Sequence, residues 1–125
     1  QSNILHLVAC LNLEINMKFT INDIGGQIAK EDDRYTVKDN TSLKNLVVSS
    51  TYLKSRKSTS GHKHEGQEEV YYFVQGTGKM ELDDKTFKVQ QGDVVLIEDG
   101  VFHRVHAGMH EDLYFVCVFD GRRKH

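Results

Sequence analysis

Apolar and polar side chains alternate along much of this chain with a period of two, the pattern of β-strands that bury one face. Seven runs rich in β-branched, aromatic and other apolar residues follow residue 45 and also predict strands: Leu46–Leu53, Glu69–Gln75, Lys79–Leu82, Thr86–Val89, Asp93–Ile97, Phe102–His106 and Leu113–Phe119. Glycine and aspartate, which tight turns favour, stand between many of them. No apolar pattern with a period of 3.6 residues persists, so the sequence predicts an all-β sandwich or barrel.

The part of the chain before Leu46 gives weaker signals. Ile24–Gln27 contains two adjacent glycines and predicts a turn, and the polar stretch EDDRYTVKDN from Glu31 to Asn40 predicts a surface loop with at most a short edge strand. Leu11–Ile21 alternates apolar and polar residues and predicts a half-buried strand. A strand at a chain end can pair with its own sheet or with a partner's, and we favour the partner, which predicts a homodimer.

The first sixteen residues are expected to be an extension outside the natural domain. Gln1-Ser2-Asn3 resembles the remnant of a purification tag, and Met17 could begin the natural chain. Ile4–Leu11 is too short to span a membrane, and no basic residue precedes it as in a signal peptide. We therefore expect residues 1–16 to be a tag remnant or a pairing strand, and residues 17–125 to be a single domain with its core in 46–119.

Composition narrows the class of partner. The chain has 125 residues with 16 Lys and Arg against 18 Asp and Glu, a formal net charge of −2 that gives no reason to expect nucleic acid or an anionic membrane. A small-molecule partner is expected instead. Cys10 and Cys117 match no metal or redox spacing, so both are interpreted as core thiols in a cytoplasmic protein.

The segment GHKHEGQEEVYYFVQG, residues 61–76, carries the candidate chemistry. In a strand, His62 and His64 point to the same side, and Glu69 can return to that side across a short turn, with Glu68 as the alternative carboxylate. The run that begins at Glu69 has apolar residues at both odd and even positions, so we expect a strand that is buried on both faces. Ionisable groups inside a barrel need neutralisation, which a divalent metal provides.

A third imidazole follows two hairpins later. His103 lies in a predicted strand that can return to the same interior point. Three histidines and one glutamate would bind iron, manganese, nickel, zinc or copper and leave positions open for substrate or water. His106 and His110 are expected at the surface.

The spacing of these residues resembles the cupin superfamily. His62, His64, Glu69 and Gly76 match the second half of the first cupin motif, although Arg56 stands where its leading glycine is expected. Gly92, Gly100 and His103 match the second motif, with Glu98 and Ala107 in place of its proline and asparagine. The resemblance implies a small single-domain cupin with a double-stranded β-helix, or jelly-roll barrel, and a metal held by His62, His64, Glu69 and His103.

The superfamily contains dioxygenases, decarboxylases, isomerases and binding modules, so the resemblance leaves the reaction open. A metal-dependent enzyme, either an isomerase or a dioxygenase, is favoured, with Tyr71 as a proton donor. A non-catalytic binding protein and a barrel that has lost its metal are the alternatives. Substrate contacts are predicted for four residues: Thr59, Tyr52, Phe73 and Met80.

A narrower likeness connects the same region with sugar phosphates. Ser58–His64, Glu69–Tyr72 and Gly76–Met80 are similar to a stretch of the cupin-type phosphoglucose isomerases of archaea. The likeness implies that Thr59 would help to hold a phosphate, and a basic cluster just upstream would assist: Lys54, Arg56 and Lys57.

Overall fold

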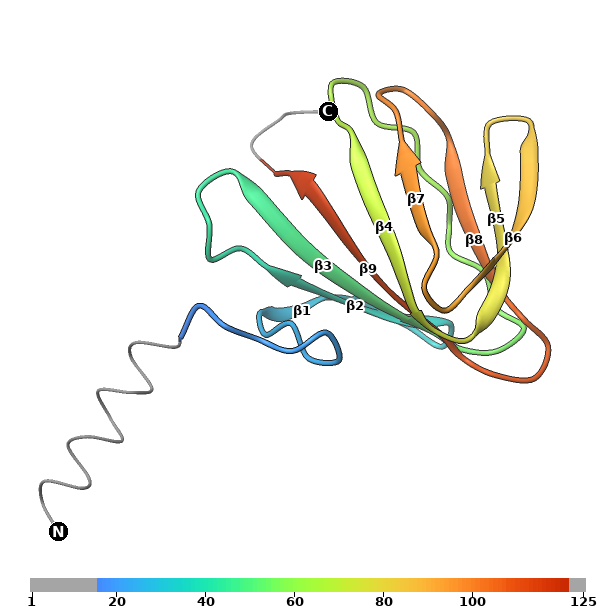
Figure 1. Cartoon of the computed structure of the whole chain (residues 1–125), viewed down its shortest axis with the longest axis horizontal. Coiled ribbons are helices and arrows are strands. Elements are labelled where there is room, and N and C mark those ends of the chain that lie inside the picture. The colour runs from blue at the N-terminus through green and yellow to red at the C-terminus, as the bar shows by residue number, and fades with distance from the viewer. Residues whose placement is uncertain (1–15, 122–125) are drawn as a thin grey trace, which may run out of the picture.

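The structure is a computed structural model that describes residues 16–121, and within this range the regular elements are strands. Nine strands follow one another along the chain (Figure 1). They are β1 (Gln27–Glu31), β2 (Tyr35–Asn40), β3 (Leu46–Leu53), β4 (Glu69–Gln75), β5 (Thr77–Leu82), β6 (Lys85–Gln90), β7 (Val94–Ile97), β8 (His103–Ala107) and β9 (Leu113–Asp120). The described residues contain no helix that is long and apolar enough to cross a membrane.

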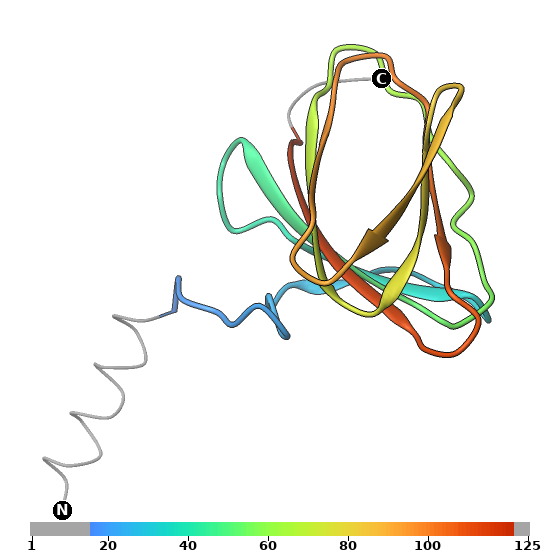
Figure 2. The ribbon, with the colours of Figure 1, turned by 45° about the vertical axis from the view of Figure 1, so that its right-hand side comes forward.

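The strands form two antiparallel sheets that face each other. The larger has six strands in the order β1-β2-β3-β9-β4-β7, and the smaller has three in the order β6-β5-β8. Figure 2 shows the sheets enclosing the interior of an open barrel, with β4 and β7 on one side and β5 and β8 on the other. This is the all-β jelly-roll, or double-stranded β-helix, that the sequence predicts.

The inner face of the six-stranded sheet is ordered in rows by its register. One row runs Asp39–Ser49–Cys117–Tyr71–Val95 across β2, β3, β9, β4 and β7, and the next contains Glu69 and Phe119. Apolar side chains from both sheets meet below these rows in the main core, where Phe73 and Met80 are fully buried. The inner face is therefore apolar at one end of the barrel and polar at the other.

The outer face of the same sheet is only partly covered. Ile24 packs there against Tyr114 and Val116, and the Tyr114 hydroxyl donates a hydrogen bond to the carbonyl oxygen of Ile21 at 2.8 Å. Beyond this segment five apolar side chains of β4, β7 and β9 remain between 37% and 69% exposed: Val70, Tyr72, Val94, Leu96 and Val118. The expectation that β4 is buried on both faces is therefore wrong, because its outward side chains meet no second layer within residues 16–121.

The stretch before β3 is more regular than the sequence predicts. Residues 35–40 form β2, which pairs with β3 over its whole length, whereas a loop with at most a short edge strand was expected. The adjacent glycines after Ile24 both have positive φ, and the chain bends at Gly26 just before β1. Of the strand predicted over Leu11–Ile21, only residues 16–21 are described, and they form turns and one isolated bridge rather than a strand. The prediction for residues 1–15, which includes Cys10, lies outside the described residues.

Candidate metal centre

An extended segment, residues 57–64, carries two of the predicted ligands along the free edge of β8. Its backbone hydrogen-bonds to β8 at several points, and the amide of Ala107 donates to the carbonyl oxygen of Lys57 at 2.9 Å. His62 and His103 exchange both backbone hydrogen bonds, at 2.9 and 2.8 Å. Residues directly opposite each other in an antiparallel bridge share a face, so both imidazoles lie on the cavity side.

Gly61 has the backbone conformation that the chain needs just before His62 pairs with His103. Its φ of +83° is a conformation that residues with a side chain rarely adopt, and a Cβ there would lie 2.7 Å from Cζ of Phe102. The ring centroid of His62 then lies 5.5 Å from that of His64 and 6.1 Å from that of His103. The three imidazoles are therefore neighbours at one end of the barrel, as the spacing predicts.

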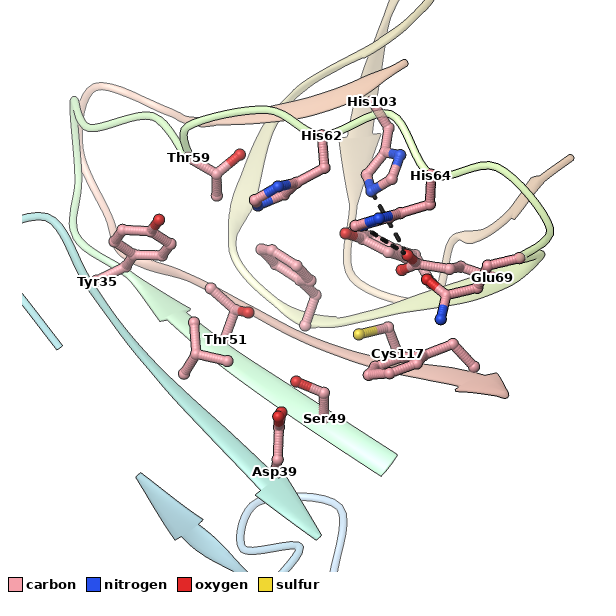
Figure 3. A pocket seen from close by; sticks show the side chains of 15 residues that line it. Tyr35, Asp39, Ser49, Thr51, Thr59, His62, His64, Glu69, His103 and Cys117 are labelled. Carbon is pink, nitrogen blue, oxygen red and sulfur yellow. Dashed lines mark ion pairs between the residues drawn. The ribbon is translucent and has the colours of Figure 1, made fainter. Parts of the chain in front are cut away.

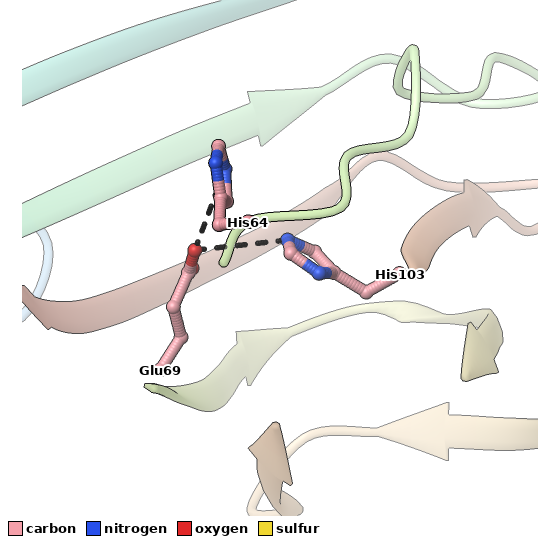
Figure 4. A group of neighbouring side chains, drawn as sticks. All are labelled: His64, Glu69 and His103. Atoms are coloured by element: carbon pink, nitrogen blue, oxygen red, sulfur yellow. Dashed lines mark ion pairs between the residues drawn. The ribbon is translucent and has the colours of Figure 1, made fainter. Parts of the chain in front are cut away.

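Three of the four predicted ligands present their donor atoms to one point. The ligand atoms of His64, Glu69 and His103 all lie within 4.8 Å of one another. Oε1 of Glu69 is 3.8 Å from Nε2 of His64 and 3.8 Å from Nε2 of His103 (Figure 4). His62 is not part of this group, and Figure 3 shows its ring on the side of the cavity toward Thr59.

A hydrogen bond from Nδ1 to the backbone fixes the tautomer of His103. Nδ1 lies 3.2 Å from the carbonyl oxygen of Val101, which can only accept, so Nδ1 carries the hydrogen and Nε2 presents a lone pair to the cavity. Burial lowers the pKa of His103, and the neighbouring His62 and His64 add to this against the Val101 hydrogen bond. The imidazole is therefore held neutral, as a metal ligand must be.

Glu69 is the buried carboxyl of the group. Its side chain is 7% exposed, and burial raises the pKa of Glu69 from 4.5 to about 7. A carboxylate oxygen and the lone pair of His103 thus face each other with little water to separate them. Two such acceptors repel unless a proton or a cation lies between them.

This donor set fits a divalent transition metal. Two imidazole nitrogens and one carboxylate oxygen, with one histidine oriented through a backbone carbonyl, are ligands that iron, manganese, nickel, zinc and copper accept. Burial lowers the pKa of His62 as well, so this histidine is also kept neutral at the edge of the group.

The candidate ligands line a cavity of about 280 Å³. Its floor is the polar end of the six-stranded sheet, and Figure 3 shows Thr59, His62 and His64 descending from the segment above it. Tyr71 and Cys117 lie on the floor beside Glu69. Burial raises the pKa of the Cys117 thiol and that of the Tyr71 phenol well above their ordinary values, so both groups stay protonated.

The predicted substrate contacts divide into two groups. Thr59 lines the cavity, and its hydroxyl accepts a hydrogen bond from the amide of Val105 at 3.0 Å. Tyr52 lies on the outer face, where its hydroxyl donates to Asp112 at 2.9 Å. Phe73 and Met80 are fully buried in the core. These last three residues do not line this cavity, because the pleat turns Tyr52 outward and packing encloses the other two.

The basic cluster predicted to hold a phosphate also lies elsewhere. Lys54, Arg56 and Lys57 do not line the cavity, and Nε of Arg56 donates to the carbonyl oxygen of Met109 at 3.2 Å. Glu68, the alternative carboxylate, is exposed. The three basic side chains are therefore not among the residues that would surround a sugar phosphate bound in this cavity.

Several cavity residues were missed from the sequence. Tyr35, Asp39, Ser49, Thr51 and Gln67 all line it. The alternation in Tyr35–Asn40 places residues 35, 37 and 39 on one face and could have revealed the β2 members, but its polar composition favoured a loop. His106, expected at the surface, is half-buried between Ser58, at 2.6 Å, and Glu81.

Two known proteins are similar to this chain in sequence. The oxalate-binding protein of Thermotoga maritima is 35% identical over 57 residues, 46% of this chain and 47% of that protein, so the match spans about half of its length. An uncharacterized protein of Methanocaldococcus jannaschii is 29% identical over 94 residues, 66% of this chain and 75% of that protein.

Solved structures share the fold at lower identity. KdgF from Halomonas sp. superposes with a TM-score of 0.70 at 22% identity, over 85% of this chain and 96% of that one. A predicted oxalate decarboxylase from Thermotoga maritima superposes with a TM-score of 0.69 at 21% identity, over 82% and 98%. Residues 50–119, more than half of the sequence, match the Cupin_2 family, described as a cupin domain. The chain therefore belongs to the Cupin_2 family.

Proposed function

We propose that this protein is a metal-dependent cupin enzyme that acts on a small, oxygen-rich molecule, a sugar or an organic acid. The observation that carries the proposal is the convergence of ligand atoms from His64, Glu69 and His103 at the buried end of a cavity. His62 is proposed as a further ligand, because its ring lies beside those of His64 and His103. A divalent ion bound there would act as a Lewis acid that polarises a ligand oxygen.

The other residues of the cavity have separate roles in this proposal. The ring of Tyr71 stacks on that of Phe115, with 5.2 Å between their centroids, and meets the ring of His103 edge-on, with 5.7 Å between their centroids. These contacts hold the Tyr71 ring beside the candidate ligands. Because its pKa is raised, Tyr71 stays protonated and serves as a hydrogen-bond donor to the bound ligand rather than as a base. Cys117 remains a neutral thiol and not a nucleophile.

A non-catalytic binding function is the second candidate. The similarity to an oxalate-binding protein favours it, although that similarity covers 46% of this chain. The sugar-phosphate isomerase alternative gains no support, because the basic cluster does not line the cavity.

Turnover assays separate the enzyme from the binding protein. Metal-loaded and chelator-treated protein are compared for oxygen consumption, decarboxylation and sugar isomerisation with a panel of small acids and sugars. The proposal expects metal-dependent turnover that Tyr71→Phe slows without loss of metal, whereas binding of an acid with no turnover by metal-loaded protein would leave only the binding function.

We also propose that two copies associate through the exposed outer face of β4, β7 and β9. The outward residues of β4 and β7 are Val70, Tyr72, Val94 and Leu96, with Val74 partly covered, so charged groups are absent from the centre of this face. A large apolar patch of this kind marks an interaction surface, and an uncharged patch can be covered by its own copy. A cytoplasmic location remains part of the same proposal and agrees with the free thiol of Cys117.

A further inference from the structure

The cavity has a second polar wall, away from the end that holds His64, Glu69 and His103. Asp39 and Ser49 are direct cross-strand partners on β2 and β3, and Thr51 is two residues further along β3 on the same face. All three line the cavity, and Figure 3 shows Ser49 between Asp39 and Cys117. The polar groups of this wall therefore form one cluster.

The Asp39 carboxylate has no assigned partner. It is half-buried, and within residues 16–121 no hydrogen bond or ion pair engages its oxygens. By contrast, Asp23, Asp32 and Asp112 each accept hydrogen bonds from neighbouring residues of the fold. A cavity-facing carboxylate with no role in the fold is available to a ligand.

The hydrogen-bonding groups of this wall determine which chemical groups of a ligand can bind to it. An ionised carboxylate only accepts hydrogen bonds, so the ligand atom that meets Asp39 must donate one. The hydroxyls of Ser49 and Thr51 both donate and accept, which matches the hydroxyl groups of a ligand. A ligand carboxylate would instead be repelled by Asp39.

The separation of the two polar ends sets the size of the ligand. β2 and β4 are separated by β3 and β9, so Asp39 and Glu69 come from strands roughly 14 Å apart, and their side chains reach inward across this space. A two-carbon dianion held near Glu69 does not extend to Asp39. The volume of about 280 Å³ accommodates a molecule of monosaccharide size.

We propose that Asp39, Ser49 and Thr51 form a hydroxyl-recognition subsite, and that the ligand is a polyhydroxylated acid of monosaccharide size rather than a short dianion. Its acidic oxygens lie at the His64, Glu69 and His103 end and its hydroxyls at the Asp39 end. This inference rests on the proposed function, because the first end is the candidate metal centre.

Calorimetric titration of metal-loaded protein tests the inference. The probes are D-gluconate, which has an acid and several hydroxyls, oxalate, which has two acids and no hydroxyl, and 5-aminopentanoate, which carries an ammonium. We expect D-gluconate to bind more tightly than oxalate. Asp39→Ala should weaken D-gluconate about tenfold, as expected for loss of a hydrogen bond to a charged group, and leave oxalate unchanged or tighter.

Two further variants keep the test interpretable. Asp33→Ala, which removes an exposed aspartate from the turn between β1 and β2, should change neither affinity. Asp39→Asn preserves the shape of the side chain and should weaken D-gluconate in the same direction, so it replaces Asp39→Ala if that variant unfolds.

The possible failures are distinguishable. If the protein binds no divalent ion, the proposed function fails and the inference falls with it. If metal binds and D-gluconate does not, or if D-gluconate binds equally well to Asp39→Ala, the inference alone is overturned. Tighter binding of 5-aminopentanoate that depends on Asp39 would assign the subsite to an ammonium group and also overturn it.

Discussion

At the scale of single residues, the burial of Glu69 and His103 determines how the candidate site responds to protons and metal ions. Each is almost fully buried, and their acceptor atoms face each other at 3.8 Å. Raising the pKa of Glu69 from 4.5 to about 7 corresponds to about 3 kcal/mol, so about half of these carboxyls carry a proton at neutral pH when no cation is bound. A metal ion and a proton therefore compete for the same oxygen atoms.

This competition predicts opposite effects of pH on stability and on metal affinity. Because the folded pKa of Glu69 exceeds its unfolded value, the stabilisation of metal-free protein is complete below about pH 4.5 and is lost as pH rises through about 7. Relative to Glu69→Gln, the metal-free wild type should lose about 3 kcal/mol of unfolding free energy over this range. Denaturant unfolding at several pH values measures it, and parallel curves for the two proteins would contradict the assignment.

The affinity for metal, in contrast to the stability of the metal-free protein, should rise with pH. One proton leaves Glu69 on binding, so affinity should rise about tenfold per pH unit up to about pH 7 and then level off.

Arg56 stands where the cupin motif has a glycine, and the backbone shows why glycine fits there. Its φ is +68°, in the left-handed region where a side chain is unfavourable. We predict that Arg56→Gly is more stable than Arg56→Ala by about 1 kcal/mol, since both lose the side chain and only alanine retains the strain. Thermal unfolding of the pair measures the difference. At Lys57, which has no positive φ, the alanine variant should be the more stable one.

At the scale of elements, the site depends on an irregular segment rather than on a regular strand. Residues 57–64 pair with β8 through backbone hydrogen bonds, and His106 adds a side-chain contact to Ser58. Pleat alternation predicted that His62 and His64 share a side, and they do. It could not predict that the donor atoms of His64 but not those of His62 come within 4.8 Å of Glu69 and His103, because the reach of a side chain depends on how the segment lies against β8.

Gly61→Ala should disturb this segment and the site together. The new Cβ would meet Phe102 at 2.7 Å in a backbone conformation that alanine adopts poorly. We expect a loss of roughly 1–3 kcal/mol in stability and weaker metal binding. Gly92→Ala is the matched control, because Gly92 has φ +93° but nothing within 4 Å of the added Cβ. Comparable loss of metal affinity in both variants would refute the role given to the Phe102 contact.

The whole molecule shows which parts of the fold its sequence specifies. Leu46–Leu53 and Glu69–Gln75 were predicted with the bounds that β3 and β4 have, because short runs rich in β-branched and aromatic residues mark strands. β2 was missed since it places polar Asp39 inward. The exposed face of Val70 and Tyr72 was mistaken for a buried one, because apolar composition does not reveal whether a second layer of the same chain covers it.

Association through this face is testable in solution. We expect the wild type to sediment as a dimer at micromolar concentration, and Leu96→Glu to sediment as a folded monomer, since its charge would be buried without a partner in the interface. Thr86→Glu on the exposed side of β6 is the control and should remain dimeric. A monomeric wild type would contradict the proposed dimer.

The central claim is that His64, Glu69 and His103 hold one divalent ion. Elemental analysis of purified protein, after reconstitution and removal of loosely bound metal, tests it most directly when the wild type is compared with His64→Ala combined with His103→Ala and with the exposed-histidine control His110→Ala. The account predicts one transition-metal ion per chain in the wild type and the control and none in the folded double variant. Full occupancy in that double variant would contradict it.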